Sequence, residues 1–506
     1  MRLIALSFLI PLLLAVAPAG WAADPGATPF AAKLDRLMNR KPLAAATVGM
    51  LVVRASDGET LYEHGADRLM IPASNQKILT TLASLSRFGP THRFTTRIWA
   101  DRPLDAAGFV NELLVEGGGD PVTNSEDWWR LAANLRFAGL RGVRGDLRVD
   151  DQRFEGPSWH PSWGRISARA YHAPVGALTA NYGQFFVSVW PSETVGDPAN
   201  VLVDPPVDYL RVNNRAKTAK RGARARLSVD RAKGRLKGGP GDEVVQVDGI
   251  ARVGDDMDQF PRSVLDPGLY AGSLLAYQLE ANGVSIEGEV KRAPRSREAQ
   301  MDAAGNVIAA EDFTLIHEHK GRSISEAVML CMKYSSNPIA ESLVKNLGAW
   351  DGASLLGEPA HAGSWERGVR ALRSELSQLG VDLGDARIVD GSGLSVKNRV
   401  SPRVFVRALD AARRSFGVGA EFMASMPIAE LDGTLEKRLR GQEGRIRAKT
   451  GLLSDASVTS LSGYAERADG EVLIFSILVN GYSGGAGAAM DAVDRLAATL
   501  LEVGAR

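Results

Sequence analysis

Cysteine is nearly absent from this chain. Cys331 is the only one in 506 residues, so no intrachain disulfide can form. It lies in the apolar segment 327–332, which indicates a buried structural thiol rather than a nucleophile. The seven histidines lack the spacing of metal ligands, and there is no pair of cysteines, so we predict no structural or catalytic zinc site.

An excess of one charge is also absent, because 60 Lys and Arg residues stand against 59 Asp and Glu. A balanced chain has no general attraction to nucleic acid or to an anionic membrane. Residues 209–237 depart from this balance, since they are rich in Lys and Arg and contain Asp230 as their only acidic residue. This segment could bind a polyanion such as a cell-wall polymer, but a solvated β-rich face is favoured.

Long apolar runs are absent except at the beginning. Arg2 precedes the apolar residues 3–16, and mostly small residues follow over 17–23. This run is too short to span a bilayer and is typical of a cleaved signal peptide, predicted over residues 1–23. No cysteine follows that could carry a lipid, so we expect a periplasmic or extracellular protein with at most peripheral membrane contact.

What the chain does contain is a serine with a lysine one helical turn later. Ser74 and Lys77 are three residues apart, so on a helix they share a face. Pro72 before them and the apolar residues from Ile78 onward predict a helix from about Ser74 to about Leu85. A neutral Lys77 could take the proton of Ser74 there and make it a nucleophile.

The same spacing occurs again at Ser342 and Lys345. Chance alone gives roughly one or two such pairs in a chain of this length. The second pair lies well inside the helix predicted over residues 340–347, where a serine has no reason to be activated. We therefore take Ser74 and Lys77 as the reactive pair.

Two more short motifs follow along the chain, Ser335-Ser336-Asn337 and Lys449-Thr450-Gly451. Taken alone, the first could be a helix-capping cluster and the second the start of a strand. In this order after a Ser-x-x-Lys motif, they resemble the three motifs of the penicillin-recognising serine enzymes.

The resemblance is closest to one family of that group. The segments 119–121, 171–178 and 390–395, and a large β-rich insertion between the first two motifs, resemble the D-alanyl-D-alanine carboxypeptidase/endopeptidase family. These are the class C low-molecular-mass penicillin-binding proteins, of the penicillin-binding protein 4 type. The resemblance covers essentially the whole chain after residue 23.

The fold that this resemblance implies is an α/β (α+β) catalytic domain, in which helices flank an antiparallel sheet, with β-rich domains inserted. We predict that residues 24–86 and 263–506 form the catalytic domain and that residues 87–262 form the insertion, as one domain or as two nested ones. The implied substrates are peptidoglycan stem peptides ending in D-Ala-D-Ala, with β-lactams as covalent inhibitors.

Each catalytic role can be matched to a residue type. Cleaving an amide needs a nucleophile, a base, an oxyanion site and an acid for the leaving amine. Ser74 would attack and Lys77 would take its proton, with the ammonium of Lys449 lowering the pKa of Lys77. Ser335 would pass a proton to the departing D-alanine. Asn337 would bind the peptide carbonyl and hold Lys77.

The third motif suits the binding of the substrate. Lys449 and Thr450 would bind its terminal carboxylate, and Gly451 lets its backbone lie close to the strand. By position in the family, the N–H groups of Ser74 and Leu452 would form the oxyanion hole. This chemistry needs neither a metal nor an organic cofactor.

Two positions depart from the pattern of the family. Ser336 stands where an aspartate is usual, and we expect tuning rather than loss of activity. Val396 stands where several relatives have an arginine that reads an anionic group on the stem peptide. The acidic partner from the insertion would be Asp150 or Asp151, so the selectivity for the free end of the stem peptide stays open.

Two other functions compete with this one. A β-lactamase would share the motifs, but the chain has no Glu-x-x-x-Asn segment of the kind that places a deacylating glutamate, and such an enzyme has no use for the insertion. A non-catalytic cell-wall-binding protein could keep the fold. It would not need two lysines beside two serines.

Overall fold

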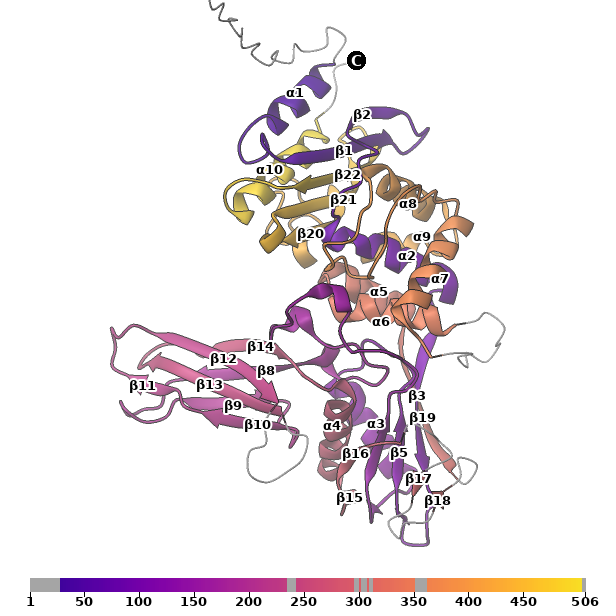
Figure 1. Ribbon diagram of the computed structural model, residues 1–506, viewed down its shortest axis with the longest axis vertical. Helices are drawn as coiled ribbons and strands as arrows, with labels where there is room; N and C mark the ends of the chain where they lie inside the picture. The colour runs from indigo at the N-terminus through magenta and orange to yellow at the C-terminus, as the bar shows by residue number, and fades with distance from the viewer. Residues whose placement is uncertain are drawn as a thin grey trace, which may run out of the picture.

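The computed structural model describes residues 28–233, 243–294, 300–301, 307–308, 313–350 and 362–502. The predicted signal peptide and the last residues of the basic segment lie outside these ranges. Figure 1 shows an elongated molecule, with a sheet and its helices at one end and two lobes at the other. In the described ranges, no helix is long and apolar enough to cross a membrane.

A five-stranded antiparallel sheet forms the centre of the catalytic domain. Its order is β2-β1-β22-β21-β20, so the first hairpin of the chain pairs with its last three strands. The long apolar runs of these strands are buried on both faces, as expected for a central sheet. The strands are β1 (Thr47–Arg54), β2 (Thr60–His64), β20 (Ile446–Leu453), β21 (Val458–Glu466) and β22 (Val472–Asn480).

Helices cover both faces of this sheet. On one face, Leu34 of α1 and Val493 and Leu496 of α10 pack against strand residues in one hydrophobic cluster. The other face packs on the remaining helices of the domain in a second cluster. The predicted fold class is confirmed. The helices are α1 (Pro29–Met38), α2 (Gln76–Phe88), α5 (Ile324–Lys333), α6 (Asn337–Ala349), α7 (Trp365–Gln378), α8 (Pro402–Arg414), α9 (Gly419–Ser425) and α10 (Ala486–Thr499).

The insertion contains a mixed five-stranded sheet of order β16-β7-β5-β3-β19, which packs on helices α3 and α4. A small sheet of order β15-β6-β4 lies beside it, and β17 pairs with β18. The elements are α3 (Ser125–Phe137), α4 (Pro267–Ala281), β3 (Arg93–Ala100), β4 (Phe109–Val110), β5 (Leu113–Glu116), β6 (Gly142–Val143), β7 (Leu147–Asp150), β15 (Ser285–Ile286), β16 (Val290–Arg292), β17 (Gln300–Met301), β18 (Val307–Ile308) and β19 (Thr314–Ser323).

The insertion ends later than the predicted residue 262. Strand β19 pairs with β3 over most of its length, and Tyr270 and Leu274 of α4 share a core with Ile98 of β3. Packing on the helices of the catalytic domain resumes at Ile324, where α5 begins. The helical periodicity after residue 268 did not reveal this boundary, because it belongs to a helix of the insertion itself.

The second lobe lies in sequence inside the first, because the chain enters it after β7 and returns at α4. It combines a three-stranded sheet of order β14-β8-β9 with a sheet in which β10, β11 and β12 all pair with β13. Figure 1 shows this lobe projecting to one side, away from the catalytic sheet. Its strands are β8 (Gln184–Trp190), β9 (Asn200–Asp204), β10 (Leu210–Asn214), β11 (Lys217–Ala219), β12 (Arg226–Lys233), β13 (Glu243–Arg252) and β14 (Asp258–Ser263).

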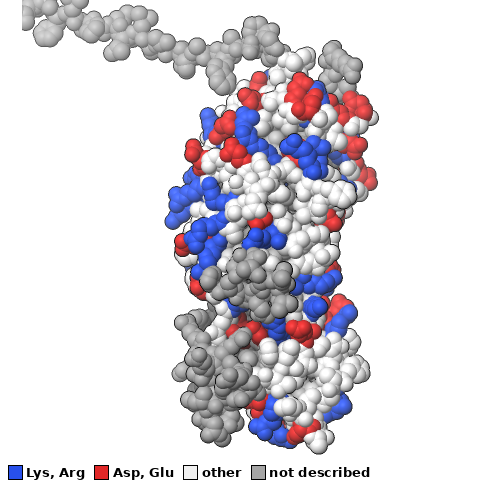
Figure 2. Space-filling view, turned by 90° about the vertical axis from the view of Figure 1, so that its right-hand side faces the viewer, with Lys and Arg blue, Asp and Glu red and all other residues white. Residues whose placement is uncertain are grey.

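The basic segment runs through this lobe, and most of its cations are exposed. Arg231 is the exception, because its buried guanidinium donates to the Ser167 carbonyl at 3.3 Å and to the Ser263 hydroxyl at 3.1 Å. On the face shown in Figure 2, basic and acidic side chains both occur along the molecule. The structure therefore gives most of this segment a solvated position, remote in sequence from the three motifs.

We expect that neutralising Lys217, Lys220, Arg221 and Arg224 together leaves turnover of a small acyl-D-Ala-D-Ala peptide within a few-fold. All four side chains are exposed. Binding to intact cell-wall sacculi, measured by co-sedimentation, is expected to weaken, because exposed cations attract a polyanion. A loss of peptide turnover above about a hundredfold, or ~2.7 kcal/mol of barrier, in a folded variant would contradict this placement.

Candidate active site

Ser74 lies in a 3-10 turn, Ala73–Asn75, directly before α2. The predicted helix therefore exists, but its regular part begins two residues later than expected. The reason is Ala73, whose φ of 48° is in the left-handed region that a non-glycine residue adopts only under strain. This turn leaves the Ser74 side chain partly exposed while its neighbours are buried.

Lys77 is fully buried and makes three hydrogen bonds. Its Nζ donates to the Ser74 hydroxyl at 3.0 Å, to Asn337 Oδ1 at 2.7 Å and to the Ser392 carbonyl at 2.8 Å. Burial lowers the pKa of Lys77 from 10.5 to about 8. A useful fraction of Lys77 is therefore a free base near neutral pH, at hydrogen-bond distance from a hydroxyl.

Ser335 and Lys449 form a second serine–lysine pair. Ser335 lies between α5 and α6 with a φ of 57°, another strained non-glycine position. Lys449 Nζ donates to the Ser335 hydroxyl at 2.9 Å and to the Thr450 carbonyl at 2.8 Å. Burial, and then the positive charge of Lys77, hold the pKa of Lys449 well below its ordinary value. The charge of Lys77 thus acts on Lys449, whereas the low pKa of Lys77 itself comes from burial, and the influence of Lys449 on Lys77 stays a prediction.

Strand β20 carries the third motif at the edge of the sheet. Gly451 lies against the turn before α2, since a Cβ there would come within 3.0 Å of the Ser74 nitrogen and 2.2 Å of Ser460 Oγ. The Thr450 hydroxyl donates to the Thr434 hydroxyl at 2.8 Å, and Leu452 is 38% exposed. An edge strand beside a reactive serine can bind an extended peptide as an added strand.

The structure thus brings together Ser74, Lys77, Ser335, Asn337 and the third motif from three separate stretches of the chain. The sequence profile of the D-Ala-D-Ala carboxypeptidase 3 (S13) family matches residues 30–500. The chain belongs to this family. The family predicted from the motifs and the enzyme class, a serine-type D-Ala-D-Ala carboxypeptidase, are confirmed.

Relatives support this assignment along the whole chain. A D-alanyl-D-alanine carboxypeptidase of Actinomadura sp. (strain R39) is 34% identical over 98% of this chain and 89% of its own length. The D-alanyl-D-alanine carboxypeptidase DacB of Haemophilus influenzae is 24% identical over 88% of both chains. The crystal structure of penicillin binding protein 4 from Haemophilus influenzae superposes with a TM-score of 0.74 at 21% identity, covering 92% of this chain and 98% of that one.

The sequence motifs did not identify one buried carboxylate of this S13 site, Glu341. It lies on α6, one helical turn after Asn337, and is 0% exposed. It accepts the N–H of Gly391 at 3.1 Å, the N–H of Ser392 at 2.7 Å and the indole N–H of Trp365 at 2.8 Å. Because the Ser392 carbonyl binds Lys77, Glu341 holds the turn that orients the candidate base. The one-turn spacing from Asn337 was the available sequence signal.

Replacing Glu341 by Gln is expected to slow acylation by a penicillin about tenfold, the effect of one weakened hydrogen bond (~1.4 kcal/mol). Burial raises the pKa of Glu341 to about 7, so the carboxylate is ionised on the alkaline side. Its negative charge favours protonated Lys77. Removing that charge lowers the pKa of Lys77, so the alkaline rise of the acylation rate should move to lower pH.

The measurement for Glu341→Gln is acylation rate against pH, with Glu375→Gln as the matched control. Glu375 is also buried, but it pairs with Arg87 rather than with the turn. Glu375→Gln should therefore leave the pH midpoint unchanged. An equal shift in both variants would show that Glu341 acts only through general stability.

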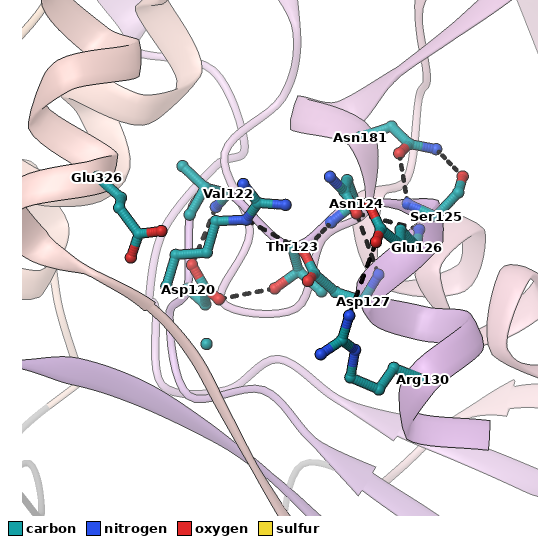
Figure 3. Close-up of polar contacts among 12 residues, drawn as sticks. Asp120, Val122, Thr123, Asn124, Ser125, Glu126, Asp127, Arg130, Asn181 and Glu326 are labelled. Atoms are coloured by element: carbon teal, nitrogen blue, oxygen red, sulfur yellow. Dashed lines mark hydrogen bonds and ion pairs between the residues drawn. The ribbon is translucent and has the colours of Figure 1, made fainter. Parts of the chain in front are cut away.

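The segment 119–121, part of the family resemblance, is a structural joint. Asp120 accepts the N–H of Val122 at 3.0 Å and the Thr123 hydroxyl at 2.9 Å (Figure 3). The Gly119 carbonyl accepts from Asn346 of α6 at 2.8 Å. Gly119 has a φ of 86°, and a Cβ would lie 2.4 Å from Asn346 Oδ1, so this joint requires glycine. It fastens the insertion to the helix that follows the second motif.

The two aspartates predicted to bind the substrate, and the lysine of the second Ser-x-x-Lys pair, have partners outside the three motifs. Asp151 pairs with Arg292 at 2.6 Å, and the buried Asp150 accepts the N–H of Gln152, so these partners belong to the insertion. Lys345 of the second Ser-x-x-Lys pair donates to the Glu155 and Pro157 carbonyls and lies 4.0 Å from the Trp365 ring centroid.

Cys331 is buried, and burial raises its pKa to about 11, which disfavours the thiolate. Within the described ranges, no cluster of three or more His, Cys, Asp or Glu residues could hold a metal ion.

Proposed function

We propose that this enzyme hydrolyses D-Ala-D-Ala at the end of peptidoglycan stem peptides through an acyl-enzyme on Ser74. The observation that carries the proposal is the 3.0 Å contact between the Ser74 hydroxyl and the buried Lys77. A lysine with a pKa of about 8 can accept the proton as the hydroxyl oxygen attacks the carbonyl carbon. An ester to Ser74 forms, and the bond to the terminal D-alanine nitrogen breaks.

Ser335 and Lys449 serve the leaving group. Ser335 donates its proton to the departing D-alanine nitrogen and regains one from Lys77, directly or by way of Lys449, so that Lys77 is again a free base. Lys449 and Thr450 bind the terminal carboxylate of the substrate, and Gly451 lets the substrate backbone approach. Water then hydrolyses the ester: Lys77 takes a proton from the water and returns it to the Ser74 oxygen as the bond to the acyl carbon breaks.

Two further groups complete the site. The N–H groups of Ser74 and Leu452 face the developing oxyanion, because Gly451 of β20 has no side chain and lets the turn that carries Ser74 approach the strand. Asn337 holds Lys77 through Oδ1, and its Nδ2 donates to the Tyr171 carbonyl at 2.9 Å. Its amide is therefore oriented before it binds the peptide carbonyl. The reaction needs no metal and no cofactor.

The same geometry supports covalent inhibition by β-lactams, since a β-lactam presents a strained amide and a nearby carboxylate. A structural relative from Haemophilus influenzae, at a TM-score of 0.69, was solved in complex with a β-lactam. The predicted signal peptide supports export to the periplasm or the outside of the cell. We expect no nucleic acid partner and at most peripheral contact with the membrane.

The test combines fluorescent penicillin labelling with release of D-alanine from an acyl-D-Ala-D-Ala peptide. We expect a stable penicillin adduct and release of one D-alanine per peptide. Rapid turnover of penicillin without a stable adduct would indicate a β-lactamase instead. Neither an adduct nor D-alanine release would indicate a non-catalytic binding protein.

A further inference from the structure

A cavity of about 410 Å³ lies at the end of the catalytic sheet where β20 begins. Its walls are the start of β20, the end of β21, the start of β22 and the end of α8, all labelled in Figure 1. None of the described residues that line it belongs to the three motifs, and Lys449 is not among them. The cavity is therefore separate from the proposed active site.

Three arginines line this cavity, Arg413, Arg445 and Arg447. Arg445 directly precedes β20 and continues its ladder, because its carbonyl accepts the N–H of Glu466 at 2.9 Å. Arg445 and Arg447 are two residues apart along an extended chain, so their side chains lie on the same face of the sheet. Arg413 comes from the last turn of α8 and adds a third cation from another wall.

The lining of the cavity has a surplus of positive charge. Within the described ranges, neither Arg445 nor Arg447 forms an ion pair, and two glutamates line the cavity beside them. Glu471 is already paired with Arg54, at 2.7 Å, which is not among the lining residues. Glu466, an exposed residue, is the other carboxylate of the described lining. An anion that enters the cavity therefore meets more positive than negative charge.

Two of the three guanidinium groups also have a buried N–H without an acceptor. Nε of Arg413 and Nη2 of Arg445 have no hydrogen-bond partner among the described residues. Arg413 otherwise donates to the Ala55 carbonyl at 2.7 Å, and Arg445 Nε donates to the Glu466 carbonyl at 3.2 Å. A buried donor without an acceptor is destabilising, and an oxyanion in the cavity would supply acceptors after small rotations of these side chains.

Guanidinium groups on two walls of one cavity favour a phosphate over a carboxylate. A phosphate group has more acceptor oxygens and more charge, so it can accept from several guanidinium groups at once. Part of the lining is apolar, with Tyr464, Met423 and Val472, and suits the carbon stem of an ester. The volume also falls within the range of pockets for small organic ligands, roughly 300–1,000 Å³.

We propose that this cavity is a second ligand site, which binds a phosphate ester with a short carbon stem through Arg445 and Arg447, with Arg413 as a third donor. Such a group occurs in soluble glycerol phosphates and in the headgroups of anionic phospholipids. The site lies beyond the peptidase activity, since none of the proposed catalytic steps uses these arginines. The inference is therefore independent of the proposed function.

The test is calorimetric titration of the enzyme with sn-glycerol 3-phosphate at constant ionic strength. We expect a Kd of about 1 mM or tighter, the affinity of a small ligand held by a few charge-assisted hydrogen bonds. Arg447→Gln and Arg445→Gln should each weaken binding about tenfold or more, because each variant keeps a polar side chain but loses the charge. Arg495→Gln, which changes an exposed arginine of α10 outside the cavity, should bind as the wild type does.

Two controls separate phosphate from charge alone and this cavity from the active site. Succinate, a dianion with two carboxylates, should bind about tenfold more weakly than glycerol phosphate. Enzyme acylated beforehand with a penicillin should bind glycerol phosphate unchanged, whereas Glu466→Gln should bind it more tightly, because that variant removes a negative charge from the lining. Equal affinity for succinate, loss of binding on acylation, or unchanged affinity in both arginine variants would overturn the proposal.

Co-sedimentation with vesicles identifies the source of the phosphate ester. Retention on phosphatidylglycerol vesicles but not on phosphatidylcholine vesicles, lost in Arg447→Gln, would assign the cavity to a phospholipid headgroup. Binding of glycerol phosphate without such retention would assign it to a soluble ester. The unfolding temperature of each variant, measured without ligand, shows that it is folded, and the two arginine variants replace each other if one is not.

Discussion

Ser74→Ala is expected to abolish covalent penicillin binding, whereas Ser342→Ala leaves it intact. Ser74 is partly exposed and 3.0 Å from a lysine whose pKa is about 8. Ser342 is 3% exposed in the middle of α6, and its partner Lys345 is engaged by backbone carbonyls of the insertion. Burial lowers the pKa of Lys345 to about 8 as well, so the two pairs differ in the serine: of the two, Ser74 is the one whose partly exposed hydroxyl is contacted by its lysine.

Ser74→Ala should lose peptide hydrolysis together with the penicillin adduct. Loss of the attacking atom removes the acyl-enzyme route, and in serine hydrolases such a loss costs on the order of 10⁴-fold or more. The measurement is intact protein mass after incubation with a penicillin, for wild type, Ser74→Ala and Ser342→Ala. An adduct that survives in Ser74→Ala would refute the choice of nucleophile, and its loss in Ser342→Ala would point to the wrong pair.

The candidate catalytic residues can be recognised in the sequence because each lies in a short motif with a characteristic spacing, and the structure brings these motifs together. Ser74 and Lys77 are one helical turn apart, and the third motif opens a strand that three apolar runs place in a sheet. Antiparallel pairing of consecutive strands follows from the hairpin signals between them. The pairing of β1 with β22 could not be predicted in this way, because the two strands are far apart in sequence.

Other parts of the site depend on tertiary contacts that leave no local trace. The left-handed φ of Ala73 and of Ser335 has no signal in residue type, since both would ordinarily avoid it. In the sequence, Glu341 looks like any other helix residue. Only the folded structure shows that it accepts the N–H of Gly391 from a distant turn. The end of the insertion was missed because β19 pairs with β3 across more than two hundred residues of sequence.

Lys449→Ala is expected to slow peptide hydrolysis by about 10²–10³-fold, the range seen when one oriented charge or donor is removed from a transition state. Lys449 is fully buried and donates to the Ser335 hydroxyl at 2.9 Å, so the variant loses both the cation for the substrate carboxylate and the partner of the proton donor. A simple binding defect would raise KM alone. Here kcat should fall as well.

The pH dependence of acylation in Lys449→Ala tests whether the positive charge of Lys449 affects the pKa of Lys77. In the proposed complex with penicillin, the ligand carboxylate would lie beside Lys449 and keep that lysine protonated, and its ammonium would then disfavour a second charge on Lys77. Without Lys449, no neighbouring cation offsets the negative charge of the penicillin carboxylate, which then stabilises protonated Lys77. The space left by the missing side chain also lets water reach Lys77. Both effects raise the pKa of Lys77 above about 8, so the alkaline rise of the acylation rate moves to higher pH.

The decisive measurement is the acylation rate at saturating penicillin against pH, because saturation reports the pKa values of the complex. We expect the midpoint of Lys449→Ala to rise by about one pH unit, or ~1.4 kcal/mol of lost coupling. Lys449→Arg keeps the charge but not the shape, so it should preserve the midpoint better than the rate. An unchanged or lower midpoint in Lys449→Ala would mean that Lys449 is not coupled to the base, and the proton path through Ser335 would then have to run through Lys77 alone.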